Sequence, residues 1–196
     1  MGRALQEIGV RRAVRYVLME LAMVVHAALL LPPLRAFWLR LLGARIGRDT
    51  HLMGPRFINL DRRGLPGLRI GARCYIARGV CFDLADSVEV LDETSIGDDT
   101  LVLTHLNVGY RDHPLQRAFP AGSTPARLGP GAFIGAHTLI LPGASVGRGA
   151  FVAAGSVVTA PVPDGVIVAG NPAREVGKVA DREARAAAAS PAPASP

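Results

Sequence analysis

A strict six-residue repeat of aliphatic side chains dominates the C-terminal half of this sequence. The repeated positions are Leu128, Ile134, Ile140, Val146, Val152 and Val158. A small residue follows four positions after each of the first five, at Ala132, Thr138, Ala144, Ala150 and Ser156. A period of six fits neither an α-helix nor a simple alternating strand, and it is typical of a parallel β-helix. We therefore predict an all-β coil whose aliphatic residues point inward and whose small residues occupy tight corners.

The same repeat recurs upstream in shorter runs. These runs are Ile46–Leu52–Ile58, Ile70–Ile76–Phe82 and Leu84–Val90–Ile96–Val102–Val108. Two breaks separate them, the polar stretch 59–67 and a two-residue offset between Phe82 and Leu84, and both should bulge outward because a solenoid accepts insertions at its corners. The largest break is a nineteen-residue interval, 109–127. An interval of that length in a compact repeat predicts a functional or disordered loop.

Length and cysteine content fit one coil domain, which we place at residues 44–179. The chain has 196 residues and is 49% hydrophobic, enough for a core without disulfides or metals. Its two cysteines, Cys74 and Cys81, match no zinc spacing. We expect both to be buried free thiols and no metal site, which is compatible with a reducing cytoplasm.

The net charge of +6 is carried almost wholly by arginine. These arginines are scattered, and no basic cluster is interleaved with aromatic residues as in nucleic-acid-binding modules. Nucleic acid is therefore not an expected partner. A phosphate-bearing small ligand or a solvated basic surface fits the composition better.

Residues 1–43 form a separate apolar region. The stretch 13–31 is rich in aliphatic residues but contains Arg15, Glu20 and His26, and ionisable groups are costly at bilayer depth. We predict helices that cover the open end of the coil or lie on the membrane surface, rather than a membrane span. A second short helix is expected over residues 33–42, and the Ala/Ser/Pro-rich tail 180–196 is expected to be disordered.

Two segments carry a family resemblance. They read IGAHTLILPGASVGRGAFVAAGSVV and GSVVTAPVPDGVIVAGNPAREVGKV. These segments resemble the left-handed β-helix acyltransferases, and within them the sugar O-acetyltransferases of the galactoside/maltose type and of the colanic-acid exopolysaccharide type. The resemblance extends over about residues 42–179. It implies a left-handed coil, acetyl-CoA as acyl donor, and a homotrimer with active sites between neighbouring coils.

His105, in the segment VLTHLNVG, is the candidate catalytic residue. The resemblance implies that this histidine deprotonates the acceptor hydroxyl, which then attacks the thioester of acetyl-CoA directly. Imidazole suits this role because its ordinary pKa lies near neutral pH. His113, in the long interval, is the second candidate, either as an acceptor contact or as an alternative base. The resemblance also implies that Asp83 touches the acceptor.

The resemblance places the donor site on four further residues. They are Ala136, Ala154, Thr159 and Arg174. The alanines and the threonine match positions along the pantetheine arm, and the arginine matches a position near the CoA phosphates, where a bidentate contact favours arginine. Many relatives have lysine directly after that threonine, whereas this chain has Ala160, so Lys178 or Arg148 must replace the contact or it is lost.

The sequence therefore predicts a cytoplasmic acetyl-CoA-dependent O-acetyltransferase acting on a saccharide, or a saccharide-lipid precursor, of a surface polymer. Residues 1–43 would allow peripheral contact with the inner face of the membrane, and the interval 109–127 would shape the choice among sugar, amino-sugar, serine and antibiotic acceptors. Two alternatives stay open. One is a non-catalytic coil that only binds partners; the other is a γ-class carbonic anhydrase, which needs three zinc-binding histidines such as His105, His113 and His137, although the close histidine pair of that class is absent.

Overall fold

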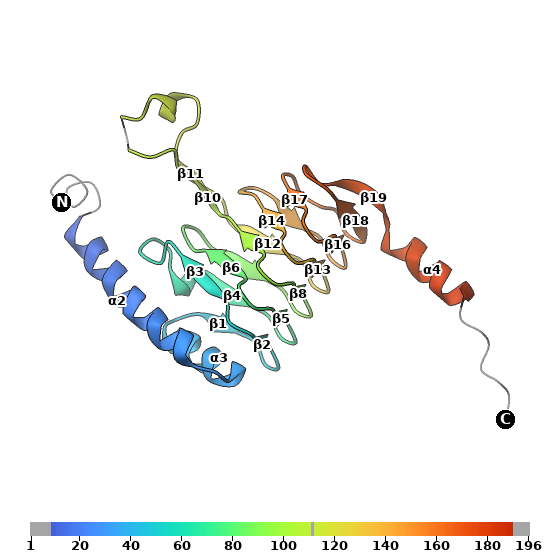
Figure 1. Cartoon of the computed structure of the whole chain (residues 1–196), viewed down its shortest axis with the longest axis horizontal. Coiled ribbons are helices and arrows are strands. Elements are labelled where there is room, and N and C mark those ends of the chain that lie inside the picture. The colour runs from blue at the N-terminus through green and yellow to red at the C-terminus, as the bar shows by residue number, and fades with distance from the viewer. Residues whose placement is uncertain (1–8, 111, 190–196) are drawn as a thin grey trace.

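The computed structural model describes residues 9–110 and 112–189. Three parallel sheets wind around one axis and form a β-helix, whose coils are stacked side by side in Figure 1. The chain passes from one sheet to the next at three corners per coil. Helix α2 lies along one end of the stack, and helix α4 leaves from the other end.

Each sheet takes one short strand from each coil. The β1 sheet contains β1 (Arg45–Ile46), β4 (Leu68–Ile70), β7 (Val88–Val90), β12 (Ala126–Leu128) and β15 (Ser145–Val146). The β2 sheet contains β2 (His51–Leu52), β5 (Tyr75–Ile76), β8 (Ser95–Ile96), β13 (Phe133–Ile134), β16 (Phe151–Val152), β18 (Val166–Ala169) and the antiparallel β19 (Arg174–Lys178). The β3 sheet contains β3 (Arg56–Ile58), β6 (Cys81–Asp83), β9 (Leu101–Val102), β14 (Leu139–Ile140) and β17 (Val157–Val158).

The six-residue repeat of the C-terminal half is confirmed as the inward-facing core. All six of its aliphatic side chains and all five of its small corner residues are buried. Neighbouring coils pair in register, as where Ile134 lies opposite Val152. The coils approach so closely at the corners that a Cβ on Gly135 would lie 2.4 Å from the backbone nitrogen of Ala154. Glycine at that position therefore permits the stacking.

Two predicted inward positions upstream are wrong. Ile58 is 39% exposed, and Phe57 takes the inward position instead, because the corner 53–55 between β2 and β3 has only three residues, so the step from Leu52 is five residues. Val108 lies beyond the coil, in the projecting loop, so the third run ends at Val102. Cys74 and Cys81 are buried and free, as predicted.

The offset between Phe82 and Leu84 does not bulge outward as predicted. Phe82, Asp83 and Leu84 are all fully buried. The side chain of Asp83 turns inward at the offset, and hydrogen-bond donors surround its carboxylate. This inward turn creates the polar corner described in the next section.

The long interval is a β-ribbon with a loop at its tip. Strands β10 (His105–Leu106) and β11 (Gly122–Ser123) pair antiparallel, and the coil resumes at β12. The 3₁₀ helix η2 (Pro114–Arg117) lies in the loop, which projects away from the coil in Figure 1. The excursion therefore begins earlier than predicted, at His105, and its stem is an ordered strand pair. A second 3₁₀ helix, η1 (Leu65–Gly67), lies in the polar stretch 59–67.

Helices α2 (Val10–Ala28) and α3 (Pro32–Leu41) form the N-terminal region. Helix α3 packs on β1 and β2 and so covers the open edge of the first coil, as predicted. Helix α2 turns Met19, Met23 and His26 toward the core. Within residues 9–110 and 112–189, no helix is long and apolar enough to cross a membrane.

The predicted disorder of the tail is wrong for residues 180–189. They belong to helix α4 (Val179–Ala189), which is rich in alanine and has Asp181 in its first turn. Alanine, glutamate and arginine are strong helix formers, and an acidic side chain in the first turn is favoured by the helix dipole. The remaining tail residues, 190–196, lie outside the described part of the chain.

Candidate active site

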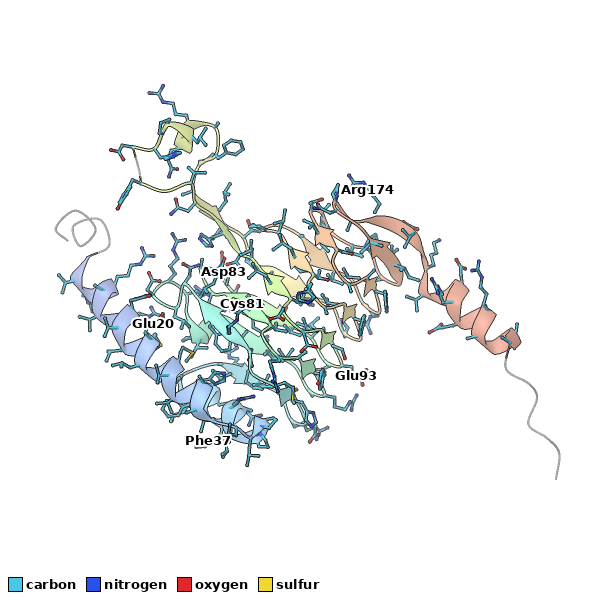
Figure 2. The ribbon with its side chains drawn as sticks, viewed as in Figure 1. Glu20, Phe37, Cys81, Asp83, Glu93 and Arg174 are labelled. Carbon is cyan, nitrogen blue, oxygen red and sulfur yellow. The ribbon has the colours of Figure 1, made fainter. Side chains whose placement is uncertain are left out.

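His105 lies at the corner where the chain leaves the β3 sheet. Its Nδ1 is 2.5 Å from Oδ2 of Asp83, which ends strand β6 one coil below. The side chain of Asp83 is fully buried, whereas that of His105 is 20% exposed. Figure 2 labels Asp83 near the base of the ribbon that carries β10. The pair therefore joins a buried carboxylate to an imidazole at the surface.

Five hydrogen bonds converge on the carboxylate of Asp83. Oδ1 accepts from Nδ2 of Asn59 at 2.7 Å and from the N–H of Ala85 at 3.0 Å. Oδ2 accepts from the N–H of Thr104 at 2.9 Å and from the N–H of His105 at 3.1 Å, in addition to the imidazole. Burial alone would raise the pKa of Asp83, but the hydrogen bonds from His105, Thr104, Asn59 and Ala85 outweigh it and lower the pKa below its ordinary value. Asp83 is therefore ionised at neutral pH.

An ionised carboxylate fixes the imidazole tautomer. Because Asp83 can only accept, Nδ1 of His105 must carry the hydrogen that lies between them. In the neutral ring, Nε2 is then left with its lone pair. This arrangement can hold a general base in one orientation at the surface of the coil.

Direct contact between Asp83 and an acceptor is not supported by this geometry. Its side chain is fully buried, and both oxygens are occupied by donors of the same chain. Asn59 and Thr104 complete the polar corner and were not predicted from the sequence. An aspartate between the two inward residues Phe82 and Leu84 was the available signal, because a buried carboxylate requires such partners.

His113 lies in the projecting loop and takes part in the structure of that loop. Its Nδ1 accepts from the N–H of Leu115 at 3.2 Å and caps η2. Gln116 braces the same loop through Asn107 and the carbonyl of Gly109. Among the described residues, no hydrogen bond joins His113 to His105, so the structure does not bring the two histidines together within one chain.

Three predicted donor-site residues line up along another corner, between the β2 and β3 sheets. Ala136 and Ala154 occupy this corner in successive coils, and Arg174 follows above them at the end of β18. The N–H groups of Ala136 and Ala154 donate no hydrogen bond to any residue that the structure describes. At the same corner of a coil nearer the N-terminus, by contrast, the N–H of Arg78 donates to Oδ1 of Asp98 at 3.0 Å. We call Ala136, Ala154 and Arg174 the donor corner.

Thr159 lies on the corner that carries His105, further along the coil axis. It shares with Arg174 a pocket of about 260 Å³ at the C-terminal end of the coil. Arg174, labelled in Figure 2, donates to the carbonyl of Ala173 at 2.8 Å and is exposed at this end. Its guanidinium retains further donors for an anion.

His105 and the donor corner are separated within one chain. About five extended residues of the β3 sheet lie between the two corners, which corresponds to roughly 15 Å. The predicted substitutes for the lysine that Ala160 replaces do not lie on the corner of Thr159 and Ala160. Arg148 and Lys178 belong to the third corner, between the β1 and β2 sheets.

The histidines required by the carbonic anhydrase alternative are dispersed. His137 lies on the corner of Ala136, and His113 lies in the loop. Over residues 9–110 and 112–189, no three histidine, cysteine, aspartate or glutamate side chains are grouped to hold a metal ion.

Comparison with known proteins places the chain in a family. Residues 125–160 match the family described as Bacterial transferase hexapeptide (six repeats). The chain is 35% identical over 132 residues to YvoF of Bacillus subtilis (strain 168), which is named as an acetyltransferase, and the match spans 66% of this chain and 70% of YvoF. It is 29% identical over 119 residues to galactoside O-acetyltransferase of Escherichia coli (strain K12), over 58% of each protein. The protein belongs to the bacterial hexapeptide-repeat transferases, with a left-handed parallel β-helix as predicted.

A solved structure shows the same fold. A galactoside acetyltransferase in complex with coenzyme A superposes with a TM-score of 0.76 and 20% identity, covering 90% of this chain and 86% of that one. The chain spans only part of several relatives, with 58% of the galactoside enzyme and 31–36% of two serine acetyltransferases matched.

Proposed function

We propose that this protein is an acetyl-CoA-dependent O-acetyltransferase that acts on a saccharide hydroxyl in the synthesis of a surface polymer. The observation that carries the proposal is the bond between buried Asp83 and the imidazole of His105. Relatives named as acetyltransferases of galactoside and serine, and a related structure with coenzyme A, support the class of reaction.

The reaction proceeds by direct transfer. Nε2 of His105 takes the proton of the acceptor hydroxyl as its oxygen attacks the thioester carbonyl of acetyl-CoA. The tetrahedral intermediate collapses with cleavage of the C–S bond, and the imidazolium returns its proton to the leaving thiolate of CoA. Asp83 holds the ring and stabilises its charged form, and it touches neither reactant.

We place the donor along the donor corner. The two free N–H groups of Ala136 and Ala154 can bind the amide carbonyls of the pantetheine arm. Arg174 would bind a CoA phosphate, a contact for which the arginine fork is well suited. Thr159 would contribute its hydroxyl from the other corner.

A homotrimer resolves the separation between the two halves of the site. In a closed ring of three chains, the corner of His105 in one chain can meet the donor corner of the next. The apolar residues of the projecting loop, Tyr110, Leu115 and Phe119, are exposed and suit contact with a neighbouring chain or an acceptor. Light scattering of the purified protein should give the mass of three chains.

We also propose a cytoplasmic location with peripheral contact to the membrane through α2. One face of this helix is an exposed apolar stripe. Its members are Val10, Val14, Val17, Leu18, Leu21, Val24 and Val25. Arg11 near the start of the helix can face the anionic inner leaflet, whereas Arg12 and Arg15 bind Asp61 and the carbonyl of Arg63 on the coil side. The stripe is the feature by which the helix would rest on lipid.

Release of CoA from acetyl-CoA tests the enzymatic proposal. Purified full-length protein should release CoA with saccharides that offer a free hydroxyl, and more slowly with serine or amino sugars. Faster turnover of serine or an amine would correct the acceptor class. Absence of release with every acceptor, despite binding of acetyl-CoA, would favour the non-catalytic coil.

A further inference from the structure

A cavity of about 650 Å³ separates the second half of α2 from the first coils. Met23 and Leu30 line it from the helical side, and Met53 and Phe57 line it from the coil. Leu30 is 82% exposed, so an apolar residue stands at the border between this cavity and the surface. The cavity therefore combines an apolar wall with access from outside.

His26 is a buried polar side chain in this wall without a partner. It is 4% exposed, and neither ring nitrogen makes a hydrogen bond within the described part of the chain. Phe57 contacts the ring edge to face, with centroids 5.7 Å apart. Burial lowers the pKa of His26, against a smaller opposing effect of the Pro55 carbonyl, and Arg35 lowers it further. The Pro55 carbonyl lies near the ring but makes no hydrogen bond of normal geometry, and it could accept from only one of the two nitrogens. Buried polar groups almost always have partners, so at least one ring nitrogen is open to a further group.

Three guanidinium groups make the cavity basic. Arg35, Arg56 and Arg78 line it together with one carboxylate, Glu20, which leaves a surplus of two positive charges. Glu20 is labelled on α2 in Figure 2. Charge and unused donors therefore favour an anion with several oxygens, such as a phosphate.

Neighbouring backbone groups hold two of these arginines. Nε and Nη1 of Arg35 donate to the carbonyls of Leu29 and Leu52 at 2.6 and 3.2 Å. Nη2 of Arg56 donates to the carbonyl of Gly79 at 3.4 Å. These bonds orient the guanidinium groups but use only part of the five N–H donors that each possesses.

The position of the cavity relates it to the proposed acetyl transfer. Arg78 stands on the corner between the β2 and β3 sheets, below Ala136 and Ala154. In the proposed trimer, His105 of the partner subunit faces this corner. The cavity would then lie on the acceptor side of the thioester, opposite the CoA phosphates at Arg174.

We propose that this cavity binds the phosphate of a lipid that carries the saccharide acceptor, with the lipid chain leaving the cavity past Met23 and Leu30. The inference rests on the proposed function, since it names the class of acceptor for the same site. His26 and the three arginines bind the phosphate, and Met23 and Leu30 contact the chain where the cavity opens to the surface. A free sugar phosphate would use the same cationic groups but would leave the apolar lining at Met23 and Leu30 without an occupant.

Calorimetric titration of the full-length protein with three soluble probes tests this site without catalysis. The probes are decyl phosphate, inorganic phosphate and decyl glucoside, which separate the whole amphiphile from its head and from a neutral amphiphile of the same chain length. Decyl phosphate should bind at least about tenfold more tightly than either of the others. Equal binding of inorganic phosphate would overturn the lipid part, and equal binding of decyl glucoside would overturn the phosphate part.

Paired charge variants locate the binding. The double variant Arg56→Gln/Arg78→Gln should weaken decyl phosphate binding about tenfold or more, whereas Arg182→Gln/Arg185→Gln, with the same change of charge on α4, should change it less than about twofold. His26→Phe fills the same space without ring nitrogens and should also weaken binding, which keeps the test valid if the double variant does not fold. Equal effects of the two double variants would overturn the site.

The outcomes distinguish this inference from the enzymatic proposal. Acetyl transfer to a free saccharide without binding of decyl phosphate would remove the lipid site and leave the enzyme. Binding of decyl phosphate by a protein that transfers acetyl to no acceptor would remove the proposed reaction and retain an anionic lipid site.

Discussion

Two buried polar regions of this protein differ in how their hydrogen bonds are satisfied. At the Asp83–His105 corner, five donors from the same chain surround one carboxylate. Under α2, the imidazole of His26 is buried without a hydrogen bond of normal geometry to any described residue. The first region is complete within one chain and orients a base, whereas the second is incomplete and lies beside a basic cavity. A satisfied polar network supports chemistry by its own residues, and an unsatisfied one indicates a ligand.

The largest expected effect is the loss of acetyl transfer when the proposed base of the first region is removed. His105→Ala should lower kcat by about 10²–10⁴, because a general base contributes about that much to proton transfer. His51→Ala, at an exposed histidine on β2, serves as the control and should retain wild-type turnover. Steady-state CoA release checks both. Wild-type turnover by His105→Ala would transfer the proposed role to His113.

A smaller loss is expected at the buried carboxylate. Asp83→Asn should lower kcat roughly 10–100-fold, because Asp83 orients the imidazole of His105 through a hydrogen bond. It should also destabilise the fold by about 1–3 kcal/mol, because an amide cannot accept from all five donors.

The acid side of the stability curve sharpens this prediction. The pKa of Asp83 is lowered in the folded chain, so its contribution is complete above the ordinary value of about 3.9 and is lost as pH falls through the folded value. Denaturant unfolding from pH 7 downward should show this loss in the wild type and not in Asp83→Asn. Parallel curves for the two proteins would contradict the assignment.

Donor affinity should respond at the other corner. Arg174→Ala should raise the KM for acetyl-CoA about tenfold with little change in kcat, because a charge-assisted phosphate contact binds substrate and transition state alike. Arg182→Ala removes one exposed arginine on α4, serves as the matched control and should leave the KM for acetyl-CoA unchanged. An unchanged KM for Arg174→Ala would remove it from the proposed donor site.

The smallest effect concerns stability under α2. Without ligand, His26→Phe should stabilise the fold by about 1 kcal/mol at pH 7, because it removes buried polar atoms that lack partners. Burial lowers the pKa of His26, so the unfolded chain takes up the proton first, and wild-type stability should fall as pH drops below about 6.5. Thermal unfolding can be measured from about pH 7.5 to about pH 5, the range in which histidine titrates. The fall in stability with falling pH should be present in the wild type and absent in His26→Phe. An equal slope in both proteins would mean that another group causes it.

The six-residue periodicity predicted the coil because every inward position buries an aliphatic side chain in the same core. Each aliphatic residue of the repeat fills the core from one of the three sides of a coil, so the six-residue spacing determines burial, register and stacking. The prediction was wrong at Ile58, because the three-residue corner 53–55 shortens the step by one residue. Local turn geometry, rather than hydrophobicity, decides such a position.

The active-site corner was predicted only in part. The motif around His105 identified the candidate base, but the inward turn of Asp83 depends on Asn59 and Thr104. These partners are 24 and 21 residues away in the chain. Sequence spacing does not reveal that three coils place them around one carboxylate. Similarly, the apolar residues of α2 predicted a helix but not that its stripe would face away from the coil.

The most direct test of the account asks whether neighbouring chains share one active site. Co-expressed His105→Ala and Ala154→Trp chains each lack one half, the first the base and the second an open donor corner. Each variant alone should be nearly inactive, and random mixed trimers should recover about a quarter of wild-type activity, since a base and a donor corner from different chains are then both intact at that fraction of sites. Trimers of the mixed chains that stay as inactive as either variant alone would contradict the shared site and the mechanism built on it.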